Sequence, residues 1–214
     1  MSTSATEASR SAFRWLNRGF MVPLHRAGLA AWLGNPATGW QLLLTTTGRR
    51  SGLPRDTPLG YVVAEGAAWV MAGYGEGTLW YKNLQADPQV QVLMPARPPF
   101  AALATPVDDP AARARIIPRL ARSMALPGSM IGAVPNAISD ERIITLTEGV
   151  PLIALRPANG DTLVAGPDDP GGHAWIARQL GAAAAALLVI RALGWLVSRR
   201  PGVNRRVGAP APRT

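Results

Sequence analysis

The chain has 214 residues, of which 48% are hydrophobic, so it can bury the core of one ordinary domain and still carry accessory segments. Its formal charge of +9 and its pI of about 11.4 imply an anionic partner, which could be a nucleic acid, an acidic membrane surface, or a phosphorylated or polycarboxylate cofactor. Cysteine is absent, and His25 and His173 are the two histidines. This composition excludes disulfides and thiolate chemistry, and we expect no metal site.

Residues 1–35 are predicted to form an N-terminal basic amphipathic helical segment. From about Ala8 to Leu33, aromatic and aliphatic side chains alternate with arginines, and Pro23 is expected to bend or restart the helix. A segment of this kind either packs on a domain or lies in a membrane interface, and packing is the favoured interpretation.

Short apolar runs separated by turns fill residues 36–157, which we interpret as a single β-rich domain. Six strands are expected, at Leu42–Thr46, Thr57–Val63, Ala68–Gly73, Val90–Met94, Phe100–Thr105 and Val150–Arg156. Two helices interrupt them, at Leu79–Ala86 and at about Pro110–Met124. Closely spaced strands with few crossover helices predict an α+β fold with a mostly antiparallel sheet closed into a small barrel.

The C-terminal part changes composition twice. Residues 158–172 are rich in proline, glycine and aspartate, which is typical of a linker, and residues 173–200 are predicted to form an apolar helix before a basic tail at 201–214. The apolar run Ala174–Val197 is long enough to span a membrane, but it contains Arg178 and Arg191. A membrane-associated tail and a helix docked on the domain or on a second subunit both remain open.

The run Gln41–Gly60 carries the strongest sign of a ligand. An apolar strand enters a turn that carries Arg49, Arg50 and Arg55 next to glycines, and a second strand follows. Glycines allow backbone amides to converge on an anion, while guanidinium groups match phosphate and carboxylate oxygens. The P-loop lysine and the strand-to-helix GxGxxG pattern are absent, so mononucleotide and Rossmann sites lose support. The turn predicts a polyanionic ligand, and a merely solvated hairpin is the alternative.

A glycine-bearing stretch, AGYGEG at 72–77, and the sequence LWYKNLQADP at 79–88 follow the turn. In this order, the motifs TTTGRRSG, PR, PLG and WYKNLQADP resemble the deazaflavin-dependent nitroreductase family, and the resemblance covers about Pro36 to Val107. It implies that 36–157 is a cofactor-binding split β-barrel of the FMN-binding split barrel-like class, with flanking N- and C-terminal helices. It also implies binding of coenzyme F420, whose tail carries a phosphodiester and glutamates, and hydride transfer from the reduced ring to an organic acceptor.

The same resemblance assigns roles to individual residues. Arg49, Arg50, Ser51, Gly52 and Arg55 would hold the tail, and Thr57 and Pro58 would shape the phosphate end of the groove. Near the ring, the resemblance implicates Ala72, Gly73, Gly75, Trp80 and Asn83. The two glycines remove side chains where a flat ring must lie against backbone. Trp80 is either a wall for the ring or a packed anchor for its helix, and Asn83 either bonds the cofactor or caps a turn.

The acceptor side departs from the family pattern. Members that reduce nitroaromatics and quinones carry tyrosines late in the chain, whereas 125–150 contains none. Tyr74, in the glycine stretch, is the candidate catalytic residue, as a proton donor or a group that positions the acceptor. Apolar side chains indicate a hydrophobic acceptor such as a quinone, a nitro compound or an enone: Met130, Ile131, Val134 and Ile138.

The sequence therefore predicts an F420-dependent oxidoreductase of the nitroreductase or quinone reductase type. The alternatives are an FMN-binding split-barrel oxidoreductase and a non-enzymatic, membrane-tethered F420-binding module. No nucleic-acid partner is expected, a homodimer is expected by analogy with other split barrels, and 8–33 and 174–206 are candidates for contact with a membrane surface. The expected location is the cytoplasm, with peripheral attachment to the inner face of the plasma membrane as a candidate.

Overall fold

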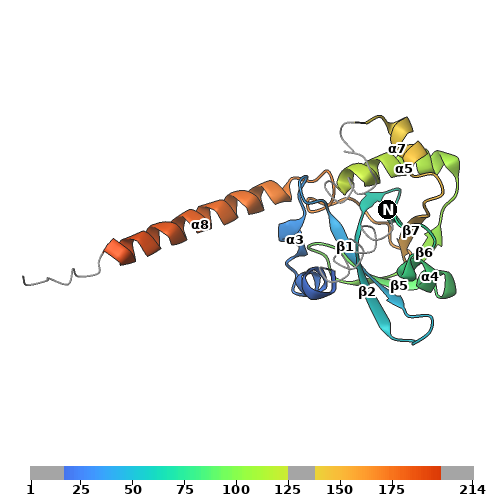
Figure 1. Cartoon of the computed structure of the whole chain (residues 1–214), viewed down its shortest axis with the longest axis horizontal. Coiled ribbons are helices and arrows are strands. Elements are labelled where there is room, and N and C mark those ends of the chain that lie inside the picture. The colour runs from blue at the N-terminus through green and yellow to red at the C-terminus, as the bar shows by residue number, and fades with distance from the viewer. Residues whose placement is uncertain (1–16, 125–137, 199–214) are drawn as a thin grey trace, which may run out of the picture. The chain divides into compact units, whose positions relative to one another are not determined.

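The computed structural model describes residues 17–124 and 138–198 (Figure 1). Contacts divide the chain into two units, which we treat separately: a barrel unit that ends at Trp175 and a second unit that begins at Ile176. The predicted boundaries at residues 35, 157, 172 and 200 remain predictions.

The barrel unit is built on one antiparallel sheet, with seven strands in the described part of the chain. Their spatial order is β2-β1-β5-β6-β7-β4-β3, and β2 at one edge also contacts β4 near the other edge, so the sheet curls into a half-barrel (Figure 1). The α+β class and the antiparallel split-barrel architecture predicted from the sequence are confirmed. The strands are β1 Gln41–Thr47, β2 Pro54–Gly60, β3 Val62–Ala64, β4 Ala67–Met71, β5 Gln89–Leu93, β6 Phe100–Pro106 and β7 Leu152–Pro157.

One predicted strand is in fact two. The run Thr57–Val63 breaks at Tyr61, because β2 pairs with β1 at one edge of the sheet whereas β3 pairs with β4 at the other. Tyr61 is fully buried at this crossing, and its carbonyl accepts a 2.8 Å hydrogen bond from Ser123 Oγ. The continuous apolar pattern could not reveal a change of partner strand.

The helices lie at the ends of the chain and between strands. α4 has the predicted bounds, and α5 ends one residue before the predicted position. From Asn17, where the described residues begin, the predicted N-terminal helical segment consists of three short pieces, and Gly28, with φ of 73°, separates α2 from α3. Helix α7 was not predicted; its first turn is capped by Ser139, and Arg113 donates to the carbonyl of Thr147 at its end. The helices are η1 Asn17–Met21, α2 Val22–Arg26, α3 Ala30–Leu33, α4 Leu79–Ala86, α5 Pro110–Ser123, α7 Asp140–Leu146 and α8 Ala174–Ser198.

Strand alternation divides the core into two apolar clusters. All five residues of β4 are buried, but Ala68 and Val70 join the first cluster, whereas Trp69 and Met71 join the second. This division follows from the two-residue period of a strand, which sends neighbouring side chains to opposite faces. The first cluster also includes residues of α4, and the second includes residues of α5. Strands β4 and β7 are thus buried on both faces along most of their length, as their continuous apolar runs require, whereas β5 and β6 alternate between buried and exposed residues.

The segment 158–172, predicted as a linker, packs against the barrel instead. Asp169 is 1% exposed; it accepts a 2.7 Å hydrogen bond from the Tyr61 hydroxyl and forms an ion pair with Arg97. Its second oxygen also accepts from the Gly166 amide at 2.7 Å. Burial, reinforced by the negative charge of Asp169, raises the pKa of Tyr61 far above its usual value, so this hydroxyl stays a donor. A buried carboxylate with three donors fastens the segment to the sheet.

Candidate functional site

Strand register brings the arginine turn and the glycine loop to the same end of the sheet. The arginine turn, residues 48–53, follows β1, whose last residues lie beside the start of β5. Across β5 and β6 the same end continues to Pro106, which pairs with Ile153 near the start of β7. The last residue of β4, Met71, pairs with Leu152, so the glycine loop, residues 72–77, also begins at this end. Two stretches that are separate in sequence therefore share one end of the barrel.

Helix α4 connects these two stretches. It begins directly after the glycine loop, and one turn later its Asn83 contacts the arginine turn. The Asn83 side-chain oxygen accepts from both the amide and the guanidinium of Arg49, each at 3.3 Å. The Asn83 side-chain nitrogen donates to Thr46 Oγ at 3.1 Å, and both residues are buried. The Asn83 side chain thus forms its hydrogen bonds with other residues of the protein and positions Arg49. The sequence had suggested either a bond to the cofactor or a turn cap for this residue.

Most backbone amides of the arginine turn already have hydrogen-bond partners in the protein. The Gly48 amide donates to the carbonyl of Leu53 at 2.9 Å, and the amides of Ser51 and Gly52 both donate to the carbonyl of Gly48. Gly52, with φ of 65°, supplies the left-handed conformation that this closure needs. The amide of Arg49 is already bonded to Asn83. The expectation that consecutive amides converge on an anion is therefore not met at these positions, and the arginine side chains remain as donors.

The arginines of this end are exposed and supported by neighbouring polar groups. Arg49 and Arg50 lie in the turn, and Arg55, near the start of β2, donates to Ser51 Oγ at 3.4 Å. Further along β2, Asp56 accepts from Thr45 Oγ at 2.7 Å and pairs with Arg26 at 2.5 Å. Arg26 is a neighbour that the sequence did not reveal, because it lies thirty residues before its partner. Arg26 offsets the charge of the one carboxylate on β2, so the hairpin keeps its positive charge.

The glycine loop leaves space above its backbone. A Cβ atom added at Gly73, Gly75 or Gly77 would have no neighbouring heavy atom within 4 Å. Gly75 has φ of 74°, its amide donates to the carbonyl of Ala72 at 2.6 Å, and its carbonyl accepts from Thr78 Oγ at 2.7 Å. The loop is therefore a closed turn with an open outer surface, on which a flat group can lie.

The remaining predicted residues are more deeply placed. Trp80 is 6% exposed within the first cluster and meets Tyr81 edge to face, with ring centroids 6.2 Å apart, so it is packed as an anchor of α4. Pro58 and Ala72 are buried, and Thr57 is half-buried on β2 opposite Leu44. The predicted role of Thr57 and Pro58 at the phosphate end of the groove stays a prediction.

The structure places two of the five residues predicted to act on the acceptor side, Tyr74 and Ile138. The Tyr74 ring is 48% exposed in the glycine loop, next to the open surface of Gly73 and Gly75. Ile138 packs against the second core cluster, which gives it a structural role. The other three residues predicted to meet an acceptor, Met130, Ile131 and Val134, lie outside the described residues.

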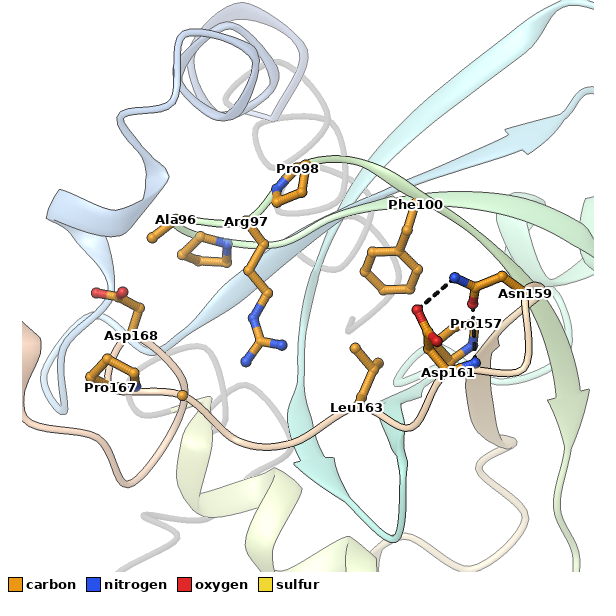
Figure 2. Close-up of a pocket in the computed structure, with 12 residues that line it drawn as sticks. Ala96, Arg97, Pro98, Phe100, Pro157, Asn159, Asp161, Leu163, Pro167 and Asp168 are labelled. Carbon is orange, nitrogen blue, oxygen red and sulfur yellow. Dashed lines mark hydrogen bonds between the residues drawn. The ribbon is translucent and has the colours of Figure 1, made fainter.

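A cleft of about 500 Å³ lies at the opposite end of the sheet (Figure 2). It is lined by the β5–β6 connection and by the segment after β7, and the Arg97 side chain points into it (Figure 2). Asn159 and Asp161 close one side through a 2.6 Å hydrogen bond. None of the predicted site residues lines this cleft, so the cleft is separate from the arginine turn.

Comparison with known proteins decides the family. A model of the F420H(2)-dependent quinone reductase family matches residues 26–126, which include the arginine turn, the glycine loop and α4. An F420H(2)-dependent quinone reductase of Mycobacterium tuberculosis strain H37Rv is 35% identical over 107 residues, which is 44% of this chain and 70% of that protein. The chain belongs to the F420H(2)-dependent quinone reductase family. A reductase of the same name from M. tuberculosis strain CDC 1551 matches with the same identity and coverage. Members of this oxidoreductase family use F420H2.

Solved structures with a related fold include other split barrels. An F420H2-dependent reductase is 23% identical with a TM-score of 0.38, over 54% of this chain and 93% of that chain. A Listeria innocua protein assigned as a pyridoxamine 5′-phosphate oxidase is 13% identical with a TM-score of 0.39, over 63% of this chain and 94% of that chain. Helix α8 lies beyond the residues that the family model matches.

Proposed function

We propose that this chain binds reduced coenzyme F420 at the arginine turn and the glycine loop and reduces a quinone or another hydrophobic acceptor. The observation that carries this proposal is the tie between the two stretches: Asn83 of α4 holds Arg49, while α4 itself begins at the end of the glycine loop. A single ligand with an anionic tail and a flat ring can therefore contact both. Family membership supports the same cofactor.

The residues present fit such a cofactor. Exposed guanidinium groups at Arg49, Arg50 and Arg55 suit a tail of phosphate and carboxylates, and charge-assisted hydrogen bonds to such groups contribute about 1.5 to 3 kcal/mol each. The open surface at Gly73 and Gly75 suits a ring that must approach backbone closely. The cofactor supplies the hydride, and the chain supplies binding, orientation and exclusion of water.

The direct test is turnover. Purified full-length chain supplied with reduced F420 should oxidise it when a quinone, a nitro compound or an enone is added. A chain that binds F420 tightly and turns over none of these acceptors would favour the carrier alternative. Preferential binding of FMN in a parallel titration would favour the FMN alternative.

The homodimer and the cytoplasmic location stay predictions. Light scattering of the same sample checks the first, and cell fractionation checks the second.

Replacing Asn83 with alanine should raise the dissociation constant for F420 about 10-fold. The substitution removes the acceptor that holds both the amide and the guanidinium of Arg49, and one lost hydrogen bond to a charged group corresponds to about 1.5 kcal/mol. Calorimetric titration measures the change. Gln85→Ala, on the exposed side of the same helix, is the matched control and should bind normally. Equal affinities of the two variants would contradict the positioning role.

Tyr74→Phe tests the candidate catalytic residue. If the hydroxyl donates a proton to the acceptor, the variant should lose about 100-fold in kcat with an unchanged dissociation constant for F420. Single-turnover kinetics with pre-bound reduced cofactor separates the two quantities. A kcat equal to that of the unsubstituted chain would remove Tyr74 from the chemistry and leave the proton to solvent.

A further inference from the structure

Helix α8 is apolar around its whole circumference. It runs without a break from Ala174 to Ser198, and the part from Ala174 to Trp195 has the length and composition of a membrane-spanning helix, with none of its most apolar stretch buried in the described structure. From Ile176 to Trp195, the large apolar side chains of this helix are each at least 42% exposed: Ile176, Leu180, Leu187, Leu188, Val189, Ile190, Leu193 and Trp195. Exposed apolar surface on this scale needs a partner.

We propose that α8 spans a lipid bilayer and anchors the barrel unit to a membrane. The inference goes beyond the proposed function, because it concerns a segment outside the matched family residues. The stretch Ala174–Trp195 measures about 33 Å at ~1.5 Å per residue, and the hydrocarbon core of a bilayer is about 30 Å thick. The length of the helix and the thickness of the membrane therefore agree.

The side chains around α8 oppose a helix that lies flat on the membrane. At about 100° per residue, Arg178 and Arg191 project ~140° apart around the helix axis. A helix in the interface plane has a polar face, whereas the orientation that turns both arginines toward water would turn Leu188 and Trp195 toward water as well. The same argument opposes docking on a protein, since the helix has apolar side chains on every side and no polar face to turn toward water.

One tryptophan and two arginines of α8 lie where a spanning helix places such side chains. Trp195 ends the apolar stretch, where an indole ring suits a membrane–water interface, whereas Trp175 packs against the first core cluster of the barrel unit. Arg178 and Arg191 each lie about 10 Å from the midpoint of the stretch Ala174–Trp195, where long side chains reach toward the headgroups. The sequence after the helix adds Arg199, Arg200, Arg205 and Arg206, which complement anionic lipid headgroups.

Flotation with vesicles tests the anchor. Full-length chain reconstituted with phosphatidylcholine and phosphatidylglycerol vesicles should float with the lipid and stay bound after washes in high salt and in alkaline carbonate. Leu187→Arg puts a charge about 4 Å from the midpoint of the stretch and should lower the ratio of membrane-bound to free chain about 100-fold. Arginine is a good helix former and Leu187 is 62% exposed, so the variant should keep its fold.

The matched control introduces the same charge at an exposed apolar residue of the barrel unit. Val164→Arg replaces a side chain that is 72% exposed and should leave flotation unchanged. Release of the unsubstituted chain by salt or carbonate would overturn the proposal in favour of peripheral contact. A chain that stays dispersed without detergent or lipid, as a monomer or a dimer, would also overturn it, as would equal flotation of Leu187→Arg. Turnover of soluble acceptors is measured separately, so these outcomes do not depend on the proposed reaction.

Discussion

Replacing Arg49, Arg50 and Arg55 together with glutamine should raise the dissociation constant for F420 about 1,000-fold. Each guanidinium is exposed, so we assign each the lower value for a charge-assisted hydrogen bond, about 1.5 kcal/mol, and the three together give about 4.5 kcal/mol. The turn should survive, because its closure depends on bonds among Gly48, Ser51, Gly52 and Leu53 and not on the three side chains. Calorimetric titration measures the affinity, and thermal unfolding confirms the fold.

A charge-matched control separates local contacts from the overall positive charge. Arg119, Arg122 and Arg142 are also exposed, and their joint replacement with glutamine removes the same charge from α5 and α7. Long-range attraction between exposed charges is screened beyond about 10 Å at ordinary ionic strength, so this control should change affinity less than about 10-fold. If both triple variants bind F420 equally, the arginine turn does not hold the tail and the proposed function loses its main support.

Asp169→Ala should lower the free energy of unfolding by about 3 to 5 kcal/mol. The substitution leaves the Tyr61 hydroxyl fully buried without its acceptor and leaves Arg97 without its carboxylate. Breaking one side of a buried ion pair typically costs this much, since the remaining charge stays desolvated. Urea unfolding followed by fluorescence measures the change.

The neighbouring Asp161 offers the control for this experiment. Asp161 lies on the same segment and accepts a 2.6 Å hydrogen bond from Asn159, but both side chains are exposed. Asp161→Ala should therefore change stability by about 0.5 kcal/mol or less. A similar loss in both variants would mean that the segment 158–172 contributes through its backbone, and that the buried carboxylate is not what fastens it.

The sequence predicted the strands and α4 well because local pattern determines them. Apolar runs of strand length between turn residues located every described strand and missed only the break between β2 and β3. The run LWYKNLQA places Trp80, Tyr81 and Leu84 on one buried helix face. The failures have a common cause, which is dependence on distant partners. The break at Tyr61 depends on which strand β3 joins, and the burial of Asp169 depends on a hydroxyl 108 residues away.

The motifs located the residues of the candidate site, but the roles of those residues became clear only from their contacts in the structure. The arginines and glycines were named from the resemblance, but the positioning role of Asn83 depends on a buried partner, Thr46, on a different element. The expected anion-binding amides depend on which carbonyls close the turn, and no composition rule reveals that Gly48 accepts twice. The prolines and glycines around Asp169 predict a linker, although Asp169 is buried and stabilises the fold.

The Tyr61–Asp169–Arg97 network and the arginine turn occupy opposite ends of the same sheet. Substitutions at sites that share no partners usually have additive effects. The protein can therefore be thermostabilised at one end by engineering while its ligand preference is evolved at the other. Directed changes in the two regions can be screened independently and then combined in a single chain.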